Sequence, residues 1–304
     1  MRMQGAVRDA YTSMTSATPQ TIAEDWSDAL VSFQREIVAI DVSREKTAAR
    51  HLVGVRAGSR MRAAIERAMP AEHAETTGLH LLLDDHAGAS LVATWAWSRG
   101  GGDWIKHIAE HGPTPAGRHG RFQGICSGFR PGSSALTPDG APVSLQSSAI
   151  VPPLPHQDDP DGWHEIRAQS GVASRRARRT DVWIDGDVQI DIHFQDSATS
   201  TNSPDRVAVH EYRVRATASA DGFELRWIEA TPHVLPFAEC PGAASNVTRL
   251  IGAPLATFRT AAIERLPGVL GCTHLNDVLR SMADVPALVS QLRRCMRETE
   301  ETVS

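Results

Sequence analysis

A thiol and an imidazole lie two residues apart in the stretch VLGCTHLNDVLRSM, residues 269–282. The apolar residues after them recur with the spacing of one helix face, at Leu275, Val278, Leu279 and Met282. This spacing predicts an amphipathic helix from about residue 274, with Thr273 as its N-cap. Cys272 is therefore expected beside the unpaired N–H groups and the positive dipole end of a helix, which favour a thiolate. His274, in the first turn, is expected to lie beside this thiol or to share a ligand with it.

Two further residues of the C-terminal half carry side chains that could act with this pair. Cys240, in LPFAECPGAASNV, precedes another predicted helix, and Pro241 suits the first position of that helix. In a predicted strand over residues 206–218, alternation places His210 on a face otherwise formed by Ala208, Tyr212, Val214 and Ala216. Because that face is mainly apolar, His210 is expected to point toward the core or into a pocket.

These four residues form a set of sulfur and nitrogen donors of the kind that binds Zn²⁺ or Fe²⁺. We predict His210, Cys240, Cys272 and His274 as metal ligands, and Cys272, His274 and His210 as catalytic residues. The spacing is not that of a zinc finger, since only Cys272-x-His274 is local. Without a metal, Cys272 would act as a thiolate nucleophile or acid/base with a histidine partner. A third interpretation is that the cysteines are buried structural thiols.

A second group of polar residues is predicted, more weakly, to bind substrate. His193 and Asp191 share the polar face of a strand whose other face is formed by Val188, Ile190, Ile192 and Phe194, and Asp191 could orient His193. Arg178 and Arg179 belong to the run SRRARRTD. Two arginines side by side suit a clamp for a carboxylate or phosphate, and a solvated run of charge is the alternative.

The elements that must position these residues are predicted from sequence period. TDVWIDGDVQIDIHFQD, residues 180–196, indicates two strands around a turn at Asp185–Asp187, and strands over 206–218 and 222–230 complete a four-stranded antiparallel meander. The period then becomes helical. This pattern predicts an α+β fold, with the helices packed on one face of the meander.

The N-terminal half is predicted to be α+β as well. Residues 1–20 lack periodicity and are expected to be a loose tail. Strands are expected over 36–43, 50–57 and 78–85, and helices over 58–70 and 102–112. Pro and Gly are frequent from 112 to 162, and VPPLPHQDDPDG, residues 151–162, resembles a linker. We therefore place a domain boundary near residue 155, between domains 21–155 and 156–304.

Composition excludes several classes of function. With 304 residues, 41% hydrophobic and 22% charged, the chain is of ordinary globular composition, and its net charge of −5 disfavours nucleic acid as a partner. It has no apolar run long enough for a membrane span and no secretory signal, so a bacterial-type cytoplasmic location is expected. Four cysteines in so long a chain do not form a disulfide scaffold, and Cys126 and Cys295 are interpreted as packing residues. Neither GxGxxG after a strand, nor a Walker loop, HExxH or GxSxG occurs.

Three motifs, in order, are similar to those of a known bacterial family. HEYRV at 210–214, LPFAEC at 235–240 and GCTHLNDVLR at 271–280 resemble domain of unknown function 2889, whose members share an H-[DE]-[MY]-like strand, a P-[YF]-x-x-C turn and a GCTHL motif. The resemblance covers most of residues 50–290. It implies no established activity, and it supports the choice of His210, Cys240, Cys272 and His274.

The sequence thus predicts a small-molecule enzyme, a Zn- or Fe-dependent hydrolase or lyase that acts on a hydrophobic carbonyl compound. A metal-free isomerase or lyase that uses a cysteine is the first alternative, and a non-catalytic binding protein with structural thiols is the second. The expected partner is a small-molecule substrate, with neither nucleic acid nor membrane, and a homo-oligomer is left open.

Overall fold

The chain divides into two compact units. The computed structural model describes residues 1–13, 18–98, 122–143, 147–152, 154, 159–165, 171–200 and 203–303. Unit 1 comprises Met1–Ser90 with Asp284–Ser304, and unit 2 comprises Leu91–Ala283. These divisions differ from the boundary predicted near residue 155, and residues 155–158 lie outside the described part. Among the described residues, no helix combines the length and apolar character needed to cross a bilayer.

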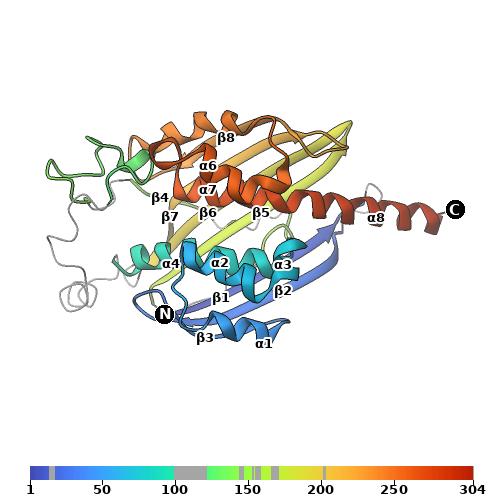
Figure 1. Cartoon of the computed structure of the whole chain (residues 1–304), viewed down its shortest axis with the longest axis horizontal. Helices are drawn as coiled ribbons and strands as arrows, with labels where there is room; N and C mark the ends of the chain where they lie inside the picture. The colour runs from blue at the N-terminus through green and yellow to red at the C-terminus, as the bar shows by residue number, and fades with distance from the viewer. Residues whose placement is uncertain are drawn as a thin grey trace. The chain divides into compact units, whose positions relative to one another are not determined.

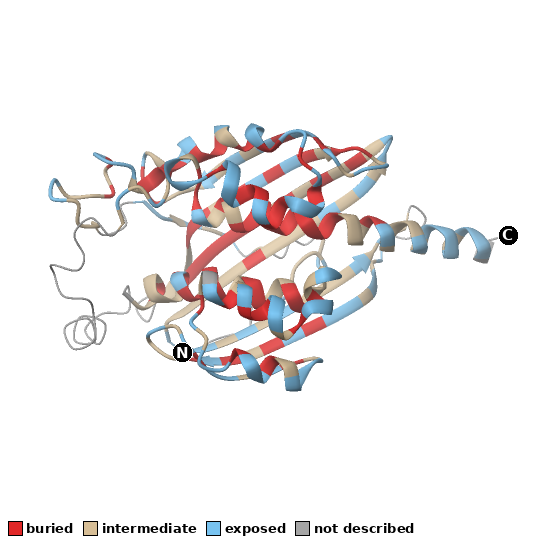
Figure 2. Ribbon diagram, in the orientation of Figure 1, coloured by how far each residue is buried: buried red, intermediate tan, exposed pale blue. Residues whose placement is uncertain are grey.

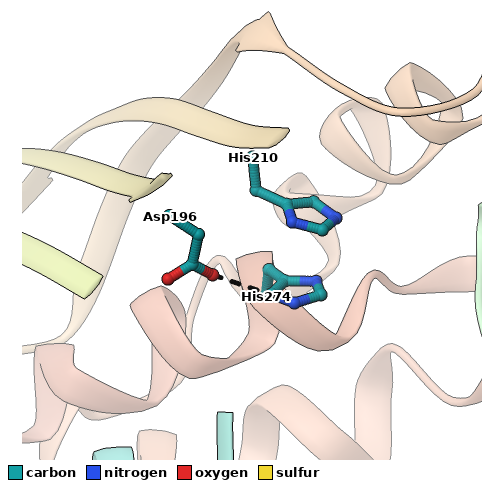
Figure 3. A group of neighbouring side chains, drawn as sticks. All are labelled: Asp196, His210 and His274. Carbon is teal, nitrogen blue, oxygen red and sulfur yellow. Dashed lines mark ion pairs between the residues drawn. The ribbon is translucent and has the colours of Figure 1, made fainter. Parts of the chain in front are cut away.

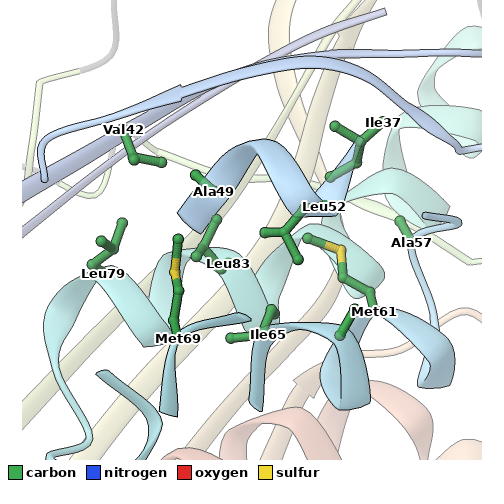
Figure 4. Packing of buried hydrophobic residues seen from close by; sticks show 11 residues of the cluster. Ile37, Val42, Ala49, Leu52, Ala57, Met61, Ile65, Met69, Leu79 and Leu83 are labelled. Atoms are coloured by element: carbon green, nitrogen blue, oxygen red, sulfur yellow. The ribbon is translucent and has the colours of Figure 1, made fainter. Parts of the chain in front are cut away.

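Unit 1 is built on a three-stranded antiparallel sheet with helices beside it (Figure 1). Its strands pair in the order β1, β2, β3 and are β1 (Arg2–Tyr11), β2 (Gln20–Val31) and β3 (Ile37–Val42). Its helices are α1 (Lys46–Ala49), η1 (Arg50–Leu52), α2 (Ser59–Ala68), α3 (Pro70–Ala74), α4 (Gly78–Ser98, which continues into unit 2) and α8 (Val285–Val303). An apolar cluster joins β3 to α2 and α4 (Figure 4) and includes Ile37, Leu52, Met61, Ile65 and Leu83.

Three predictions for this half were wrong. The expected loose tail, residues 1–20, contains strand β1, which pairs with β2. The expected strand over 50–57 begins with the single turn η1 and makes only an isolated bridge from Arg56 to Glu36. The expected strand over 78–85 is the start of α4, because its apolar run continues to residue 98 and a short apolar run does not distinguish strand from buried helix. The predicted helix over 58–70 is confirmed as α2, whereas the helix predicted over 102–112 lies outside the described residues.

Unit 2 contains the predicted meander. Strands β5 (Ala173–Asp185), β6 (Asp187–Ser200), β7 (Ser203–Ala218) and β8 (Leu225–Val234) pair consecutively and antiparallel, and the short β4 (Ala149–Ile150) pairs with the start of β7. The helical segments that follow are η4 (Cys240–Leu250), η5 (Leu255–Thr257), α6 (Phe258–Arg265), η6 (Gly268–Leu270), α7 (Thr273–Ser281) and η7 (Met282–Asp284). The predicted α+β fold class is confirmed.

One face of the meander is buried, and α7 contacts it through β7 (Figure 2). Alternation along β6 and β7 gives this inner face its members, as predicted: Val188, Ile190, Ile192, Phe194, Ala208, His210, Tyr212, Val214 and Ala216 are all buried. The inner face is therefore where the meander meets its helices, and polar residues on it must find partners inside the protein.

Candidate functional site

Three polar residues form one row across the inner face. Arg176 of β5 is the register partner of Asp196 of β6, which in turn is the partner of His210 of β7. Directly paired residues point to the same side of a sheet, so all three side chains share the inner face. The register then shifts, since Ser197 pairs with Ala208 and leaves Val209 as an extra residue. Such a bulge ends the regular apolar alternation next to His210 and is a common way to direct a side chain at a site.

Asp196 is fully buried, and Arg176 holds both of its oxygens. The Arg176 Nε donates to Oδ1 at 2.9 Å and Nη2 donates to Oδ2 at 2.9 Å. The remaining guanidinium nitrogen, Nη1, donates to Asp277 Oδ2 of α7 at 2.8 Å. The Arg176 side chain is 4% exposed and lies over the Phe194 ring. This fork-shaped cation fixes the Asp196 carboxylate and ties α7 to the sheet.

His274 completes the group from the first turn of α7 (Figure 3). Its ring stacks on the ring of His210 with 3.5 Å between centroids and 17° between planes. Its Nε2 atom lies 3.8 Å from Asp196 Oδ2, and one potential ligand atom from each of Asp196, His210 and His274 lies within 4.8 Å of the others. Two imidazoles and a carboxylate, all shielded from bulk water, thus converge at the junction of β6, β7 and α7.

Burial keeps both imidazoles neutral. Desolvation and the positive charge of Arg176 lower the pKa of His274 to about 3. The pKa of His210 is also lowered well below its ordinary value, chiefly by burial and by the neighbouring His274, although Asp196 opposes the shift. Within the described part of the chain, the Nδ1 atom of His210 is buried without a hydrogen-bond partner. A neutral ring nitrogen in such a place is a ready ligand or proton acceptor.

The predicted cysteines lie next to this group. Cys272 is the N-cap of α7, so the helix begins one residue earlier than predicted, at Thr273. Burial raises the pKa of the Cys272 thiol, although the N–H groups of Leu275 and His274 act in the opposite direction. The pKa of Cys240, the first residue of η4, is raised to about 12, mainly by burial. The expectation of a thiolate stabilised by a helix N-terminus alone is therefore wrong, because desolvation outweighs the dipole.

The residues predicted to bind substrate divide between the two faces of the sheet. Arg178 is the register partner of Phe194 and shares the inner face with it. His193, Asp191 and Arg179 occupy the opposite face. There His193 contacts Glu211 at 3.1 Å, Asp191 accepts from Arg213, and Arg179 pairs with Asp159 and Asp181. The structure thus does not bring these three together with His210, and Asp191 orients Arg213 instead of His193.

Sequence reasoning missed Asp196, Arg176 and Asp277. The signal for Asp196 was present, since it continues the inward positions Ile192 and Phe194 by one further step of two residues. An acidic residue at an inward position requires a buried partner, and the arginine run across the hairpin supplies it. Asp277 lies two residues outside the last apolar position of the first helical turn, and its spacing carries no comparable signal.

Comparison with known proteins gives a family and nothing more specific. No curated protein matches the chain, and no solved structure matches it. A family model described as "Protein of unknown function (DUF2889)" matches residues 174–288, a segment that holds all six of the residues Arg176, Asp196, His210, Cys240, Cys272 and His274. The resemblance predicted from HEYRV, LPFAEC and GCTHLNDVLR is thereby confirmed, and residues 174–288 belong to the DUF2889 family.

Proposed function

We propose that His210, His274 and Asp196 form the metal centre of an enzyme and bind Zn²⁺ or Fe²⁺. The convergence of two neutral imidazoles and one buried carboxylate is the observation that carries the proposal. Two histidines with one carboxylate are a ligand set typical of hydrolytic zinc sites and of non-haem iron sites, where open positions remain for water or substrate. This set replaces Cys240 and Cys272 of the predicted ligands with Asp196.

The chemistry of the three donors suits a divalent ion. Metal binding requires deprotonated ligands, and the lowered pKa values of His210 and His274 meet that requirement at neutral pH. The unpartnered Nδ1 of His210 gains a partner when it binds a metal. Arg176 holds the Asp196 carboxylate as an outer-shell partner, a role that commonly orients metal ligands.

The surroundings of the site favour an apolar substrate. Phe194, Tyr212 and Val214 line the inner face beside the polar row and are fully buried. A metal ion at this place polarises a carbonyl oxygen or lowers the pKa of a bound water. A hydrolase or lyase that acts on a hydrophobic carbonyl compound is the reaction class that fits both the donor set and this lining.

The stack of His210 on His274 favours a second candidate, a metal-free enzyme. Ring lone pairs lie in the ring plane, so two nearly parallel rings direct their nitrogens into separate planes and not at one point. In that arrangement His274, 3.8 Å from Asp196, would act as a general base. A shared metal ion requires one ring to rotate out of the stack, because ligand atoms on one zinc ion are roughly 3.4 Å apart at its usual bond lengths.

Metal content separates the two candidates. The protein is purified without a metal-binding tag or chelator and analysed for Zn and Fe, then again after anaerobic reconstitution. We expect one ion that is lost in His210→Gln, His274→Gln and Asp196→Asn. His193→Gln, on the opposite face of the same sheet, is the matched control and should retain the ion. Absence of metal after reconstitution, or its retention in all three site variants, refutes the metal centre and leaves the general-base candidate.

A further inference from the structure

Three of the four cysteines come from distant parts of unit 2 to one place. Cys126 lies in the loop before η3 (Ser127–Phe129), Cys240 begins η4 and Cys272 caps α7. Ser127 joins the three: its backbone N–H donates to the Gly271 carbonyl at 2.8 Å, and its hydroxyl donates to the Glu239 carbonyl at 2.8 Å. Each of these bonded residues is the immediate neighbour of one cysteine. The three backbones are therefore held together by one serine.

A glycine leaves the space between two of the thiols open. A Cβ atom added to Gly128 would lie 2.6 Å from the Cys240 Sγ and 3.9 Å from the Cys126 Sγ. No side chain fits at this position without moving the Cys240 sulfur. The backbone of Gly128 has a negative φ, so its conformation does not by itself demand glycine, and the approach of the thiols is the physical reason for it.

A buried hydroxyl also lies at this place. Tyr212, on the inner face of β7, is fully buried, and its hydroxyl has no geometrically satisfactory hydrogen-bond partner within the described residues. The nearby Cys272, Cys240 and Cys126 all raise the pKa of this hydroxyl, in addition to the larger effect of burial, so it stays protonated and can donate. The rest of the lining is apolar, since Phe129, Phe237 and Ala135 pack around Cys240.

We propose that Cys126, Cys240 and Cys272 bind a soft metal ion, Zn²⁺ or Cu⁺, as three thiolates, with the Tyr212 hydroxyl donating a hydrogen bond to one of the sulfurs. Thiolates are the preferred ligands of these ions, and a site linking separate loops is typical of structural metals. This thiol site is separate from the group formed by His210, His274 and Asp196, and it does not depend on the function proposed for that group.

Binding is a proton-for-metal exchange with no redox step. Each thiol loses its proton to solvent as its sulfur bonds the ion, and no oxidant or reductant takes part. Buried thiols that stay protonated without a metal become thiolates only when the cation arrives. Cys126 is the least buried of the three, so the ion has access to the site from its side.

The test is a Co²⁺ titration of the reduced, chelator-treated full-length protein under anaerobic conditions. We expect a sulfur-to-cobalt charge-transfer absorption that saturates at one ion and that Zn²⁺ abolishes by displacement. The absorption should be lost in Cys126→Ser, Cys240→Ser and Cys272→Ser, and Gly128→Ala should weaken Co²⁺ binding by roughly 10- to 100-fold. Cys295→Ser, which alters the thiol of α8, is the matched control and should leave the absorption unchanged.

Two further arms keep failures distinguishable. The absorption should persist in His210→Gln and His274→Gln, so loss of the imidazole metal centre does not remove it. In case a cysteine variant does not fold, alkylation of the wild-type protein is followed by mass spectrometry, and Zn²⁺ should slow the reaction at the partly exposed Cys126 but not at Cys295. Absence of the absorption together with an unchanged alkylation rate at Cys126 overturns the proposal, as does an absorption that survives all three cysteine substitutions.

Discussion

Replacement of Arg176 by Met provides a sharp test of how the site is held together. The substitution keeps the apolar stem of the side chain and removes the three hydrogen bonds that the guanidinium donates to Asp196 and Asp277. Asp196 is completely buried, so its carboxylate would lose two charge-assisted bonds with no access to water. Removal of one partner from a buried ion pair costs about 3–5 kcal/mol, because the remaining charge is left uncompensated.

The assay is urea denaturation at neutral pH, followed by far-UV circular dichroism. Arg215→Met is the matched control, since Arg215 also pairs with a carboxylate, that of Glu229 at 2.5 Å, but both side chains are about half exposed. Such a pair contributes about 1 kcal/mol or less. Asp196→Asn in the Arg176→Met background should restore part of the lost stability. If Arg176→Met destabilises the protein no more than Arg215→Met does, the account of a buried ion-pair network at this site is wrong.

Two other substitutions have defined outcomes. Burial lowers the pKa of His86 to about 4, from an ordinary 6.5, so its contribution to stability is complete above about pH 6.5 and is lost as pH falls to about 4, a loss of about 3 kcal/mol that His86→Gln should remove from the pH dependence of the urea midpoint. Gly271→Ala should destabilise the protein by about 1–3 kcal/mol in the same assay, because its Cβ would lie 2.4 Å from the Leu266 carbonyl oxygen. Gly222→Ala, where the nearest atom is at 3.8 Å, should have little effect, and equal destabilisation by both would show that the clash is not the cause.

The meander could be predicted from the sequence because its signal is local. Val188, Ile190, Ile192 and Phe194 alternate without interruption, and the turn at Gly186 has the positive φ that glycine permits. The same alternation correctly placed His210 on the inner face. Face assignments of this kind depend only on residues that are near each other in the chain, which is why they are confirmed.

The grouping of the site residues was beyond such reasoning. The stack of His210 on His274 depends on how α7 lies on the sheet, and the contact of Ser127 with Gly271 joins segments far apart in sequence. The bulge at Val209 also has no signature in the local pattern. Alternation shows which way a side chain points, but only packing shows what it meets there. For that reason two of the four predicted metal ligands are grouped with Asp196, and the two cysteines are grouped with Cys126.

Cys272 shows how burial can reverse a rule that is read from sequence. A helix N-terminus stabilises a thiolate by a fraction of its charge, typically up to about 2 kcal/mol in partly buried sites, whereas complete burial of an uncompensated charge costs several kcal/mol. The N–H groups of His274 and Leu275 do lower the pKa of this thiol, yet its burial raises it by more. A reactive thiolate at Cys272 would therefore need a full positive charge nearby and not the partial charge of a dipole. A bound cation supplies that charge, and the same reasoning applies to Cys240, whose thiol is still harder to ionise without one.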